Sequence, residues 1–157
     1  SSEVKREFNI QNYIDEILLS ISNVIKKTSL TFAINVDKNL KIDSFPGAFS
    51  QVLINLILNA IKHAYDDEKE GVITITVQVK NNTLELIFKD DGKGISKENL
   101  PKIFDLFFTT QLNNGGTGLG LNIVYNIITS NLNGTIKCES FENEGTVFNI
   151  TIPLADK

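Results

Sequence analysis

Apolar residues recur at two different spacings along this chain, and each spacing predicts one kind of element. Helical spacing predicts helices over residues 11–27, 46–65 and 119–132, the second opened by Pro46-Gly47. Alternating apolar and polar positions predict strands over residues 30–36, 40–42, 72–79, 84–88, 134–140 and 146–152, after a short leading strand at Phe8 and Ile10. We therefore expect an α+β fold in two layers, one mixed sheet faced by three helices.

Two connections in this pattern differ in character. Asn81-Asn82 is a plausible tight hairpin turn between two of the strands. Residues 90–116 show little regular pattern beyond a short helix near 97–103. A loop this long within a compact domain is usually either disordered or a functional lid.

Composition limits the classes of protein that the chain can represent. The 157 residues, 41% hydrophobic and 22% charged, fit a single globular domain. A net charge of −4 gives no support to a nucleic-acid surface. The one cysteine, Cys138, cannot form an internal disulfide, and its place in an expected strand favours a buried, inert thiol. No apolar run approaches the roughly 20 residues that cross a bilayer, and no signal peptide is visible. The chain has no methionine and begins at Ser1, so we expect a piece of a longer protein.

The helix expected over residues 46–65 carries polar residues on one side. Asn55, Asn59, Lys62 and His63 fall within a stripe of roughly 80–100°. The opposite side holds the apolar residues Leu53, Leu56, Ile57, Ala60, Ile61 and Ala64. Asparagine is a poor residue inside a helix because its amide competes for backbone hydrogen bonds. Two asparagines one turn apart therefore indicate a used face rather than a solvated one.

Two glycine-containing segments follow this helix. The first, Asp90-Asp91-Gly92-Lys93-Gly94-Ile95, leaves a strand, and its glycines allow a tight turn and a close approach to a flat ligand. The second, Gly115-Gly116-Thr117-Gly118-Leu119-Gly120-Leu121, opens a helix, whose backbone N–H groups and dipole suit phosphates. A dinucleotide fingerprint would follow a strand directly, and here a loop precedes the segment, which disfavours that reading.

These segments, with Ile103-Phe104-Asp105-Leu106-Phe107-Phe108 between them, resemble the N, G1, F and G2 boxes of the ATP-binding domain of sensor histidine kinases. That family belongs to the GHKL superfamily, with gyrase, the Hsp90 chaperones and the MutL proteins. The resemblance covers about residues 8–154 and implies the Bergerat fold. It also implies one catalytic domain over residues 1–157, with an ATP lid at about 93–116 and without the dimerisation and phosphoacceptor domain.

The resemblance implies a protein-histidine kinase of two-component signal transduction. Such a domain binds ATP and Mg²⁺ and transfers the γ-phosphate to a histidine on a separate dimerisation domain. The implied partners are that domain and a response-regulator receiver domain, with no nucleic acid. We expect the fragment to be monomeric, its parent to be a homodimer, and both to be cytoplasmic or the cytoplasmic part of a membrane-bound sensor.

The resemblance also assigns roles to individual residues. Asn59 is the implied Mg²⁺ ligand, Asn55 supports the phosphates or the metal, and Lys62 reaches a phosphate; these three form the catalytic set. Asp90 accepts but cannot donate, so it would bond the amine of adenine and repel the carbonyl of guanine, which selects ATP over GTP. Thr146 resembles the threonine that helps to bridge adenine through water. The remaining implied nucleotide contacts are Gly92, Gly94, Ile95, Phe104, Thr117, Gly118, Leu119, Gly120 and His63.

Two rival functions remain open. The ATPases of the superfamily carry a glutamate where this chain has Asn55, and an amide cannot accept a proton from the attacking water. Autonomous ATP hydrolysis is therefore disfavoured. The other rival is a non-catalytic nucleotide-binding module. It is favoured by one difference from the family pattern: many relatives carry a basic residue where this chain has Gln111. A lid contact to the γ-phosphate is then missing unless Lys62, Lys93 or Lys97 supplies it.

The expected lid and the lone histidine complete the interpretation. Phe104, Phe107 and Phe108 are expected to anchor the lid through apolar contacts. His63 is the only histidine in the chain and is followed by Ala64-Tyr65 rather than by Asp or Glu. It therefore lacks the pattern of a phosphoacceptor and is either a nucleotide or metal-water contact or a structural residue.

Overall fold

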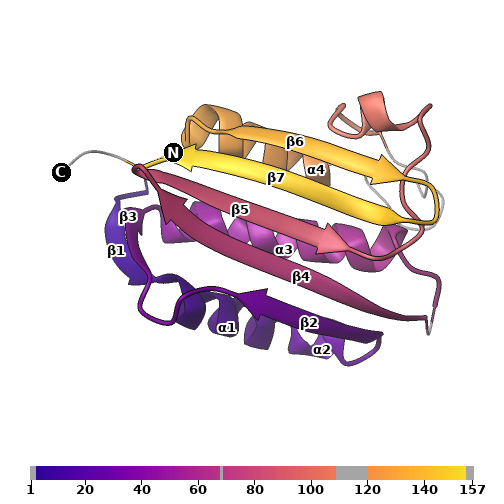
Figure 1. Ribbon diagram of the computed structural model, residues 1–157, viewed down its shortest axis with the longest axis horizontal. Coiled ribbons are helices and arrows are strands. Elements are labelled where there is room, and N and C mark those ends of the chain that lie inside the picture. The colour runs from indigo at the N-terminus through magenta and orange to yellow at the C-terminus, as the bar shows by residue number, and fades with distance from the viewer. Residues whose placement is uncertain (1–2, 68, 109–119, 155–157) are drawn as a thin grey trace.

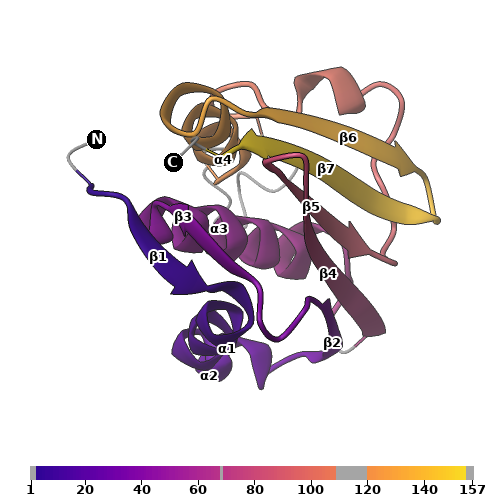
Figure 2. The ribbon, with the colours of Figure 1, turned by 60° about the vertical axis from the view of Figure 1, so that its left-hand side comes forward.

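The chain folds around a five-stranded mixed sheet, as the computed structural model shows for residues 3–67, 69–108 and 120–154. The strands lie in the order β2 (Ser29–Asn35), β4 (Glu70–Lys80), β5 (Thr83–Asp90), β7 (Gly145–Pro153) and β6 (Thr135–Phe141). β2 and β4 run parallel, and the other neighbours are antiparallel. Figures 1 and 2 show the helices on one side of this sheet, which confirms the α+β prediction.

The helices are shorter than the sequence pattern predicts. They are α1 (Ile10–Ser20), α2 (Ser22–Ile25), α3 (Pro46–His63), the 3₁₀ helix η1 (Leu100–Lys102), α4 (Gly120–Asn126) and the π-helix η3 (Ile127–Asn131). The helix expected over 11–27 breaks at Ile21, next to Ser20, whose hydroxyl donates to the Ile17 carbonyl at 2.7 Å and competes with the backbone ladder. The helix expected over 119–132 ends in the wider η3 turn, where the Leu132 N–H donates to Ile127 O.

A two-stranded ribbon lies apart from the main sheet. β1 (Arg6–Asn9) pairs antiparallel with β3 (Lys41–Ser44), so the strand expected at 40–42 does not join its sequence neighbour β2. The segment before this ribbon also holds the start of α3. α3 has no side-chain cap of its own, and the Glu3 carboxylate accepts hydrogen bonds from the Gly47 and Ala48 N–H groups at 2.6 and 3.1 Å.

The core lies between α3 and the middle of the sheet. Leu53 and Ile57 of α3 and Ile73, Ile75 and Phe88 of the sheet are completely buried. This packing confirms the predicted apolar face of α3 and turns its polar stripe away from the sheet. Among the described residues, no helix is long and apolar enough to cross a bilayer.

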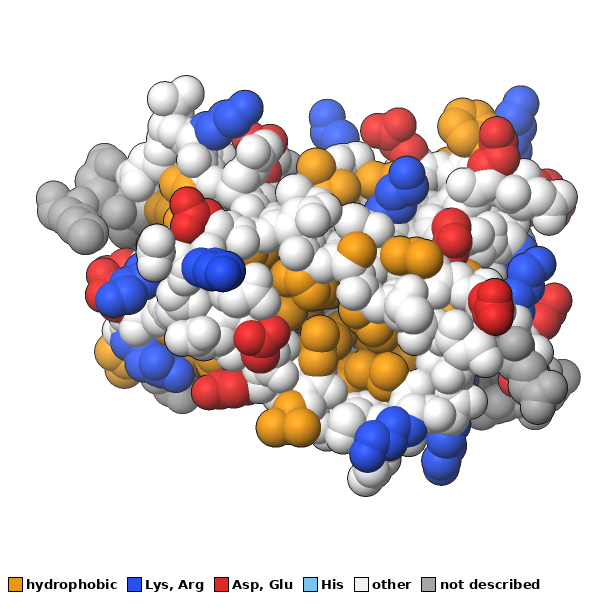
Figure 3. Space-filling view, turned by 60° about the horizontal axis from the view of Figure 1, so that its bottom comes forward, with side chains coloured by type: hydrophobic (Ala, Val, Ile, Leu, Met, Phe, Trp, Pro, Cys, Tyr) orange, Lys and Arg blue, Asp and Glu red, His pale blue; other side chains and the backbone are white. Residues whose placement is uncertain are grey.

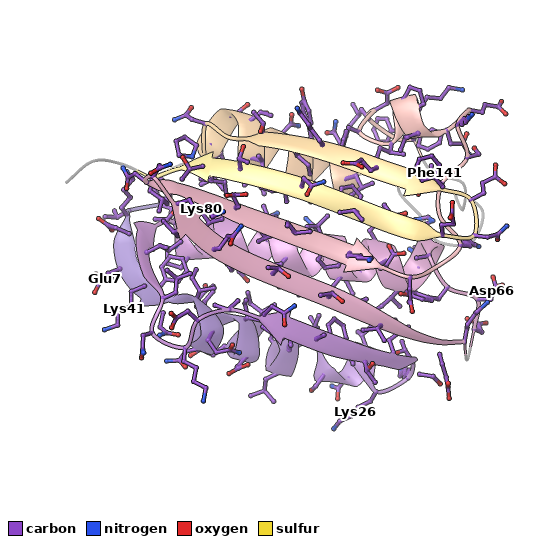
Figure 4. All side chains as sticks on the ribbon, viewed as in Figure 1. Glu7, Lys26, Lys41, Asp66, Lys80 and Phe141 are labelled. Atoms are coloured by element: carbon purple, nitrogen blue, oxygen red, sulfur yellow. The ribbon has the colours of Figure 1, made fainter. Side chains whose placement is uncertain are left out.

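Several chain segments converge at one end of the sheet. β5 ends there at Asp90, α3 ends at His63, and the β6–β7 turn lies beside them. Figure 4 shows Asp66, just after α3, and Phe141, at the end of β6, at this same end. At the opposite end, Asn81 and Asn82 both have positive φ (50° and 60°), as the predicted tight hairpin turn requires.

The surface nearest β2 is not dominated by side chains of one charge. Figure 3 shows the Lys and Arg side chains of that face interspersed with Asp and Glu around an apolar centre. Phe32 and Ile34 of β2 are among the half-buried hydrophobic residues that pack against the core.

Candidate functional site

A cleft of about 760 Å³ opens where these segments converge. Its described walls come from α2, the C-terminal half of α3, the end of β5, residues 93–108, the start of α4, and the β6–β7 turn with the start of β7. Of the residues predicted from sequence, the following line it: Asn55, Asn59, Lys62, His63, Asp90, Gly94, Ile95, Gly120 and Thr146. The structure thus brings together most of the described residues that the sequence singled out.

Asp90 lies at the floor of the cleft and is 3% exposed. Its carboxylate accepts a hydrogen bond from the Gly92 N–H at 2.9 Å. Burial raises the pKa of Asp90, while the backbone N–H groups of Gly92 and Thr146 oppose this shift. A buried carboxylate of this kind is a strong acceptor for a ligand that brings a donor.

The glycines of the first segment are required by the packing of the protein. A Cβ on Gly92 would lie 2.2 Å from the Ala64 carbonyl oxygen, and one on Gly94, whose φ is +73°, would lie 2.1 Å from the Phe141 carbonyl oxygen. The turn is therefore held between the end of α3 and the β6–β7 turn. Gly92 itself is not among the residues that line the cleft, and it serves the site by bonding to Asp90.

Asp91, which the sequence interpretation left without a role, joins three elements outside the cleft. Its carboxylate accepts hydrogen bonds from the Tyr65 hydroxyl at 2.6 Å and from the Val72 N–H at 2.9 Å. Burial alone would raise the pKa of Asp91, but these bonds outweigh it and lower that pKa. Burial, followed by the bond to Asp91, raises the pKa of Tyr65. The Tyr65–Asp91 pair therefore ties the end of α3 to β4 and to the Asp90 turn.

Buried hydroxyl groups lie beside Asp90. Thr146 and Ser140 are 4% and 7% exposed, and their hydroxyl oxygens are 2.8 Å apart. The Ile95 N–H donates to the Ser140 hydroxyl at 2.8 Å. These contacts place the Thr146 side chain at the cleft wall and fix the start of the segment that follows Gly94. The nearby Cys138 is half-buried, and burial raises its thiol pKa to about 12, as expected of an inert thiol.

The α3 side of the cleft is more open. Asn55, Asn59 and His63 are half-buried, and Lys62 is exposed. Burial, with the positive charges of Lys62 and Lys93, lowers the pKa of His63, so its imidazole is neutral at pH 7. Lys93 also lines the cleft and forms a 3.5 Å ion pair with the exposed Asp66.

The expectations for the lid segment are partly wrong. Phe107 is 64% exposed at a positive φ of 65°, so it does not anchor the segment. Phe104 is not among the residues that line the cleft; its ring packs 5.4 Å from Tyr125 and 6.2 Å from Phe148. Phe108 does line the cleft. The predicted contacts Thr117, Gly118 and Leu119 lie outside the described residues, as does Gln111.

Other residues of the cleft were missed by sequence reasoning. Asn99, Glu142 and Asn143 lie in irregular segments, where no periodic pattern could single them out. Ser140 does not line the cleft but contacts Thr146, and it did carry a signal, because it follows Ile136 and Cys138 on the inward face of β6. A polar residue on a buried strand face calls for partners.

The side chains of α3 offer the cleft amide oxygens, which are candidate ligands for a metal ion. Among the described residues, no group of three or more His, Cys, Asp or Glu side chains gathers to hold a metal. The amides of Asn55 and Asn59 face the cleft and take part in no side-chain hydrogen bond with another described residue. Amide oxygens suit Mg²⁺ when a ligand supplies further oxygens.

Known proteins resemble this chain over most of its length. Residues 46–156 match the family "Histidine kinase-, DNA gyrase B-, and HSP90-like ATPase". Sensor histidine kinase ZraS of Salmonella typhi is 37% identical over 150 residues, which cover 93% of this chain and 30% of that protein. The chain therefore spans about a third of this curated relative.

Solved structures agree with these sequence matches. The nucleotide-free catalytic domain of histidine kinase ThkA matches with a TM-score of 0.81 and 34% identity, over 96% of each chain. The structure of ThkA in complex with response regulator protein TrrA matches with a TM-score of 0.77 and 30% identity, over 96% of this chain and 42% of that one.

Proposed function

This chain belongs to the histidine kinase-, DNA gyrase B- and HSP90-like ATPase family as a histidine kinase catalytic domain, and we propose that it holds Mg·ATP in the cleft and presents the γ-phosphate to a histidine on a separate helical domain. The observation that carries the proposal is that the floor of the cleft and its α3 side offer different polar groups. The buried acceptor Asp90 at the floor suits the adenine amine, and the polar edge of α3 suits the phosphates and their metal.

At the phosphate end of the cleft, we assign a different role to each polar residue of α3. Asn59 offers an amide oxygen to Mg²⁺, Asn55 supports the phosphates or the metal, and Lys62 adds positive charge. When bound, Mg²⁺ would supply positive charge that neutralises the phosphates. Phosphoryl transfer requires mainly positioning and electrostatic stabilisation, so a protein without a covalent intermediate can perform it.

Among the described residues, α3 carries no carboxylate where an ATPase of the superfamily would need one to activate water. Among its described lining residues the carboxylates are Asp90 and Glu142, on β5 and in the β6–β7 turn, and neither belongs to α3. Asn55 cannot take a proton from water at neutral pH. We therefore favour transfer to a separate acceptor over hydrolysis. We assign His63, neutral and half-buried on α3, as a contact to the nucleotide or to a metal-bound water and not as the phosphoacceptor.

The proposed partners follow from the kinase function. One is a dimerisation domain that carries the acceptor histidine, so that the full-length protein is a homodimer. The other is a response-regulator receiver domain, as in the complex of ThkA with TrrA.

Incubation with γ-labelled ATP and Mg²⁺ tests the proposal. The chain alone is expected to bind ATP without labelling itself or releasing phosphate at an appreciable rate. Adding a helical domain with an acceptor histidine should give an acid-labile label on that domain, and Asp90→Asn should strongly reduce this transfer at limiting ATP. Acid-labile label on His63, or phosphate release that a carboxylate variant of this chain removes, would contradict the proposal.

A further inference from the structure

Ser140 sits at the end of a row of polar side chains that crosses three strands. Asp90 of β5 is the direct ladder partner of Thr146 on β7, and Thr146 is the direct partner of Ser140 on β6. All three side chains are buried. Asp90 and Thr146 line the cleft, and Ser140 does not. The family resemblance implied roles for the first two residues and none for Ser140.

The Ser140 hydroxyl uses its complete hydrogen-bonding capacity. It donates its one proton to the Gly145 carbonyl oxygen at 2.9 Å. It accepts from the Ile95 N–H at 2.8 Å, and its oxygen lies 2.8 Å from the Thr146 hydroxyl oxygen. With the one proton of Ser140 assigned to the Gly145 carbonyl, we assign Thr146 as the donor in the bond between the two hydroxyl groups.

This assignment decides what Thr146 can offer to a ligand. Its proton points away from the cleft toward Ser140, so its oxygen can only accept. The neighbouring Asp90 carboxylate also only accepts. The floor of the cleft therefore presents two acceptors side by side and no side-chain donor from this pair.

From this geometry we propose that Ser140 is a positioning residue for base selection: it holds the Thr146 hydroxyl as an acceptor, so that the cleft favours a purine with an amine at position 6 over one with a carbonyl. The proposal rests on the proposed ATP-binding function and deepens it. Without Ser140, the Thr146 hydroxyl is free to turn its proton into the cleft, where it can donate to a carbonyl oxygen.

The same hydroxyl connects the base site to the segment that begins after Gly94. Through the Ile95 N–H, Ser140 fixes the backbone where the chain leaves the Asp90 turn. The Asn143 N–H donates to Lys93 O at 2.7 Å and adds a second tie between the β6–β7 turn and this segment. Ser140 therefore holds two walls of the cleft at once.

The test compares ATP with inosine triphosphate, which carries a carbonyl at position 6. Binding of both nucleotides is measured by calorimetry on the wild-type chain and on Ser140→Ala. We expect Ser140→Ala to weaken ATP binding by roughly three- to tenfold, while affinity for inosine triphosphate changes by less than about twofold or rises. The preference for ATP should therefore fall by roughly three- to tenfold.

The same ladder provides a matched control. Thr135 and Thr151 are also direct partners on β6 and β7, with hydroxyl oxygens 2.6 Å apart, but Thr135 is exposed, Thr151 is half-buried, and neither lines the cleft. Thr135→Ala should leave both affinities unchanged. Thr146→Val should reproduce the loss of preference, and the Ser140→Ala/Thr146→Val double variant should lose no more preference than Thr146→Val alone.

The outcomes separate this proposal from the proposed function. Equal losses for both nucleotides in Ser140→Ala, or unchanged affinities, would overturn the role of Ser140 while wild-type ATP binding stands. Additive effects of the two substitutions on the preference would also overturn it. A wild-type chain that binds neither nucleotide would overturn both. A circular-dichroism melt of each variant establishes that the folded chain is being compared.

Discussion

The floor of the cleft and its α3 side hold their polar side chains in different ways. At the floor, Asp90, Thr146 and Ser140 are buried, and each takes part in hydrogen bonds within the protein. On the α3 side, Asn55 and Asn59 are half-buried and take part in no side-chain hydrogen bond with another described residue. The hydrogen bonds of the floor are already formed in the free protein. The amides on the α3 side are left to bind a ligand.

This difference fits the two parts of ATP, the purine base and the triphosphate with its metal ion. The purine ring is rigid, so a fixed set of acceptors recognises it with little loss of entropy. The triphosphate and its Mg²⁺ change partners during transfer, and a wall of half-exposed amides and the exposed Lys62 can adapt to them. We therefore expect substitutions at the floor to change recognition of the base and substitutions on α3 to change dependence on the metal.

Replacing the buried acceptor should have the largest effect. Asp90→Asn removes a charge-assisted bond and can set an amide N–H₂ against the adenine amine, so ATP binding should weaken by about 1.5–3 kcal/mol. Calorimetric titration measures this change. The adjacent Asp91→Asn is the control, because Asp91 bonds to Tyr65 and Val72 instead; it should lower the melting temperature and affect ATP affinity far less. An unchanged affinity in Asp90→Asn would remove the residue from the base site.

Breaking the tie between the two regions should reduce stability. Tyr65→Phe removes the hydroxyl that donates to the Asp91 carboxylate and accepts from the Asp91 N–H at 3.0 Å. We expect the free energy of unfolding to fall by about 1.5–2 kcal/mol, measured by urea denaturation. Tyr13→Phe provides a comparison, because Tyr13 is half-buried within the ring cluster of Phe8 and Phe49. Equal stability of Tyr65→Phe and wild type would show that the tie is unimportant.

The metal dependence sharpens the contrast from the α3 side. Asn59→Ala deletes the proposed ligand, so ATP binding should weaken about tenfold in the presence of Mg²⁺, and much less with a chelator present. The same titrations on Asp90→Asn should show similar losses in both conditions. If Asn59→Ala loses equal affinity with and without Mg²⁺, Asn59 does not bind the metal.

The smallest expected effect is a pH dependence from His63. Its pKa in the folded chain lies below the ordinary value near 6.5, so the unfolded chain binds a proton first as the pH falls. The contribution of His63 to stability is therefore present above about pH 6.5 and is lost as the pH falls through its folded pKa. Urea denaturation at about pH 7.5 and 5.5 should show a smaller acid-induced loss in His63→Gln than in wild type. Identical losses would contradict the shifted pKa, since the chain contains no other histidine.

The sequence predicted the fold and the main site residues where a local pattern was sufficient. The polar stripe of α3 follows from helical periodicity, and Asp90 follows from its place between a strand and a glycine turn. Ladder partners were beyond that reasoning, because the pairing of Asp90, Thr146 and Ser140 depends on strand order and register. The role of Asp91 likewise depends on a contact with Tyr65, 26 residues earlier in the chain. Phe107 failed as a prediction because an apolar residue in a loop can be exposed when its backbone turns outward.

Hydrogen exchange with and without a Mg·ATP analogue tests the contrast between the two regions most directly. We expect residues 86–90 and 140–148 to be protected already without nucleotide and to change little, because their hydrogen bonds exist in the free chain. Residues 96–108, which border the cleft without a strand or α-helix, should be poorly protected without nucleotide and gain protection when it binds. Poor protection of residues 86–90 and 140–148 in the free chain, with equal gains in protection for both regions on binding, would contradict a preformed base site.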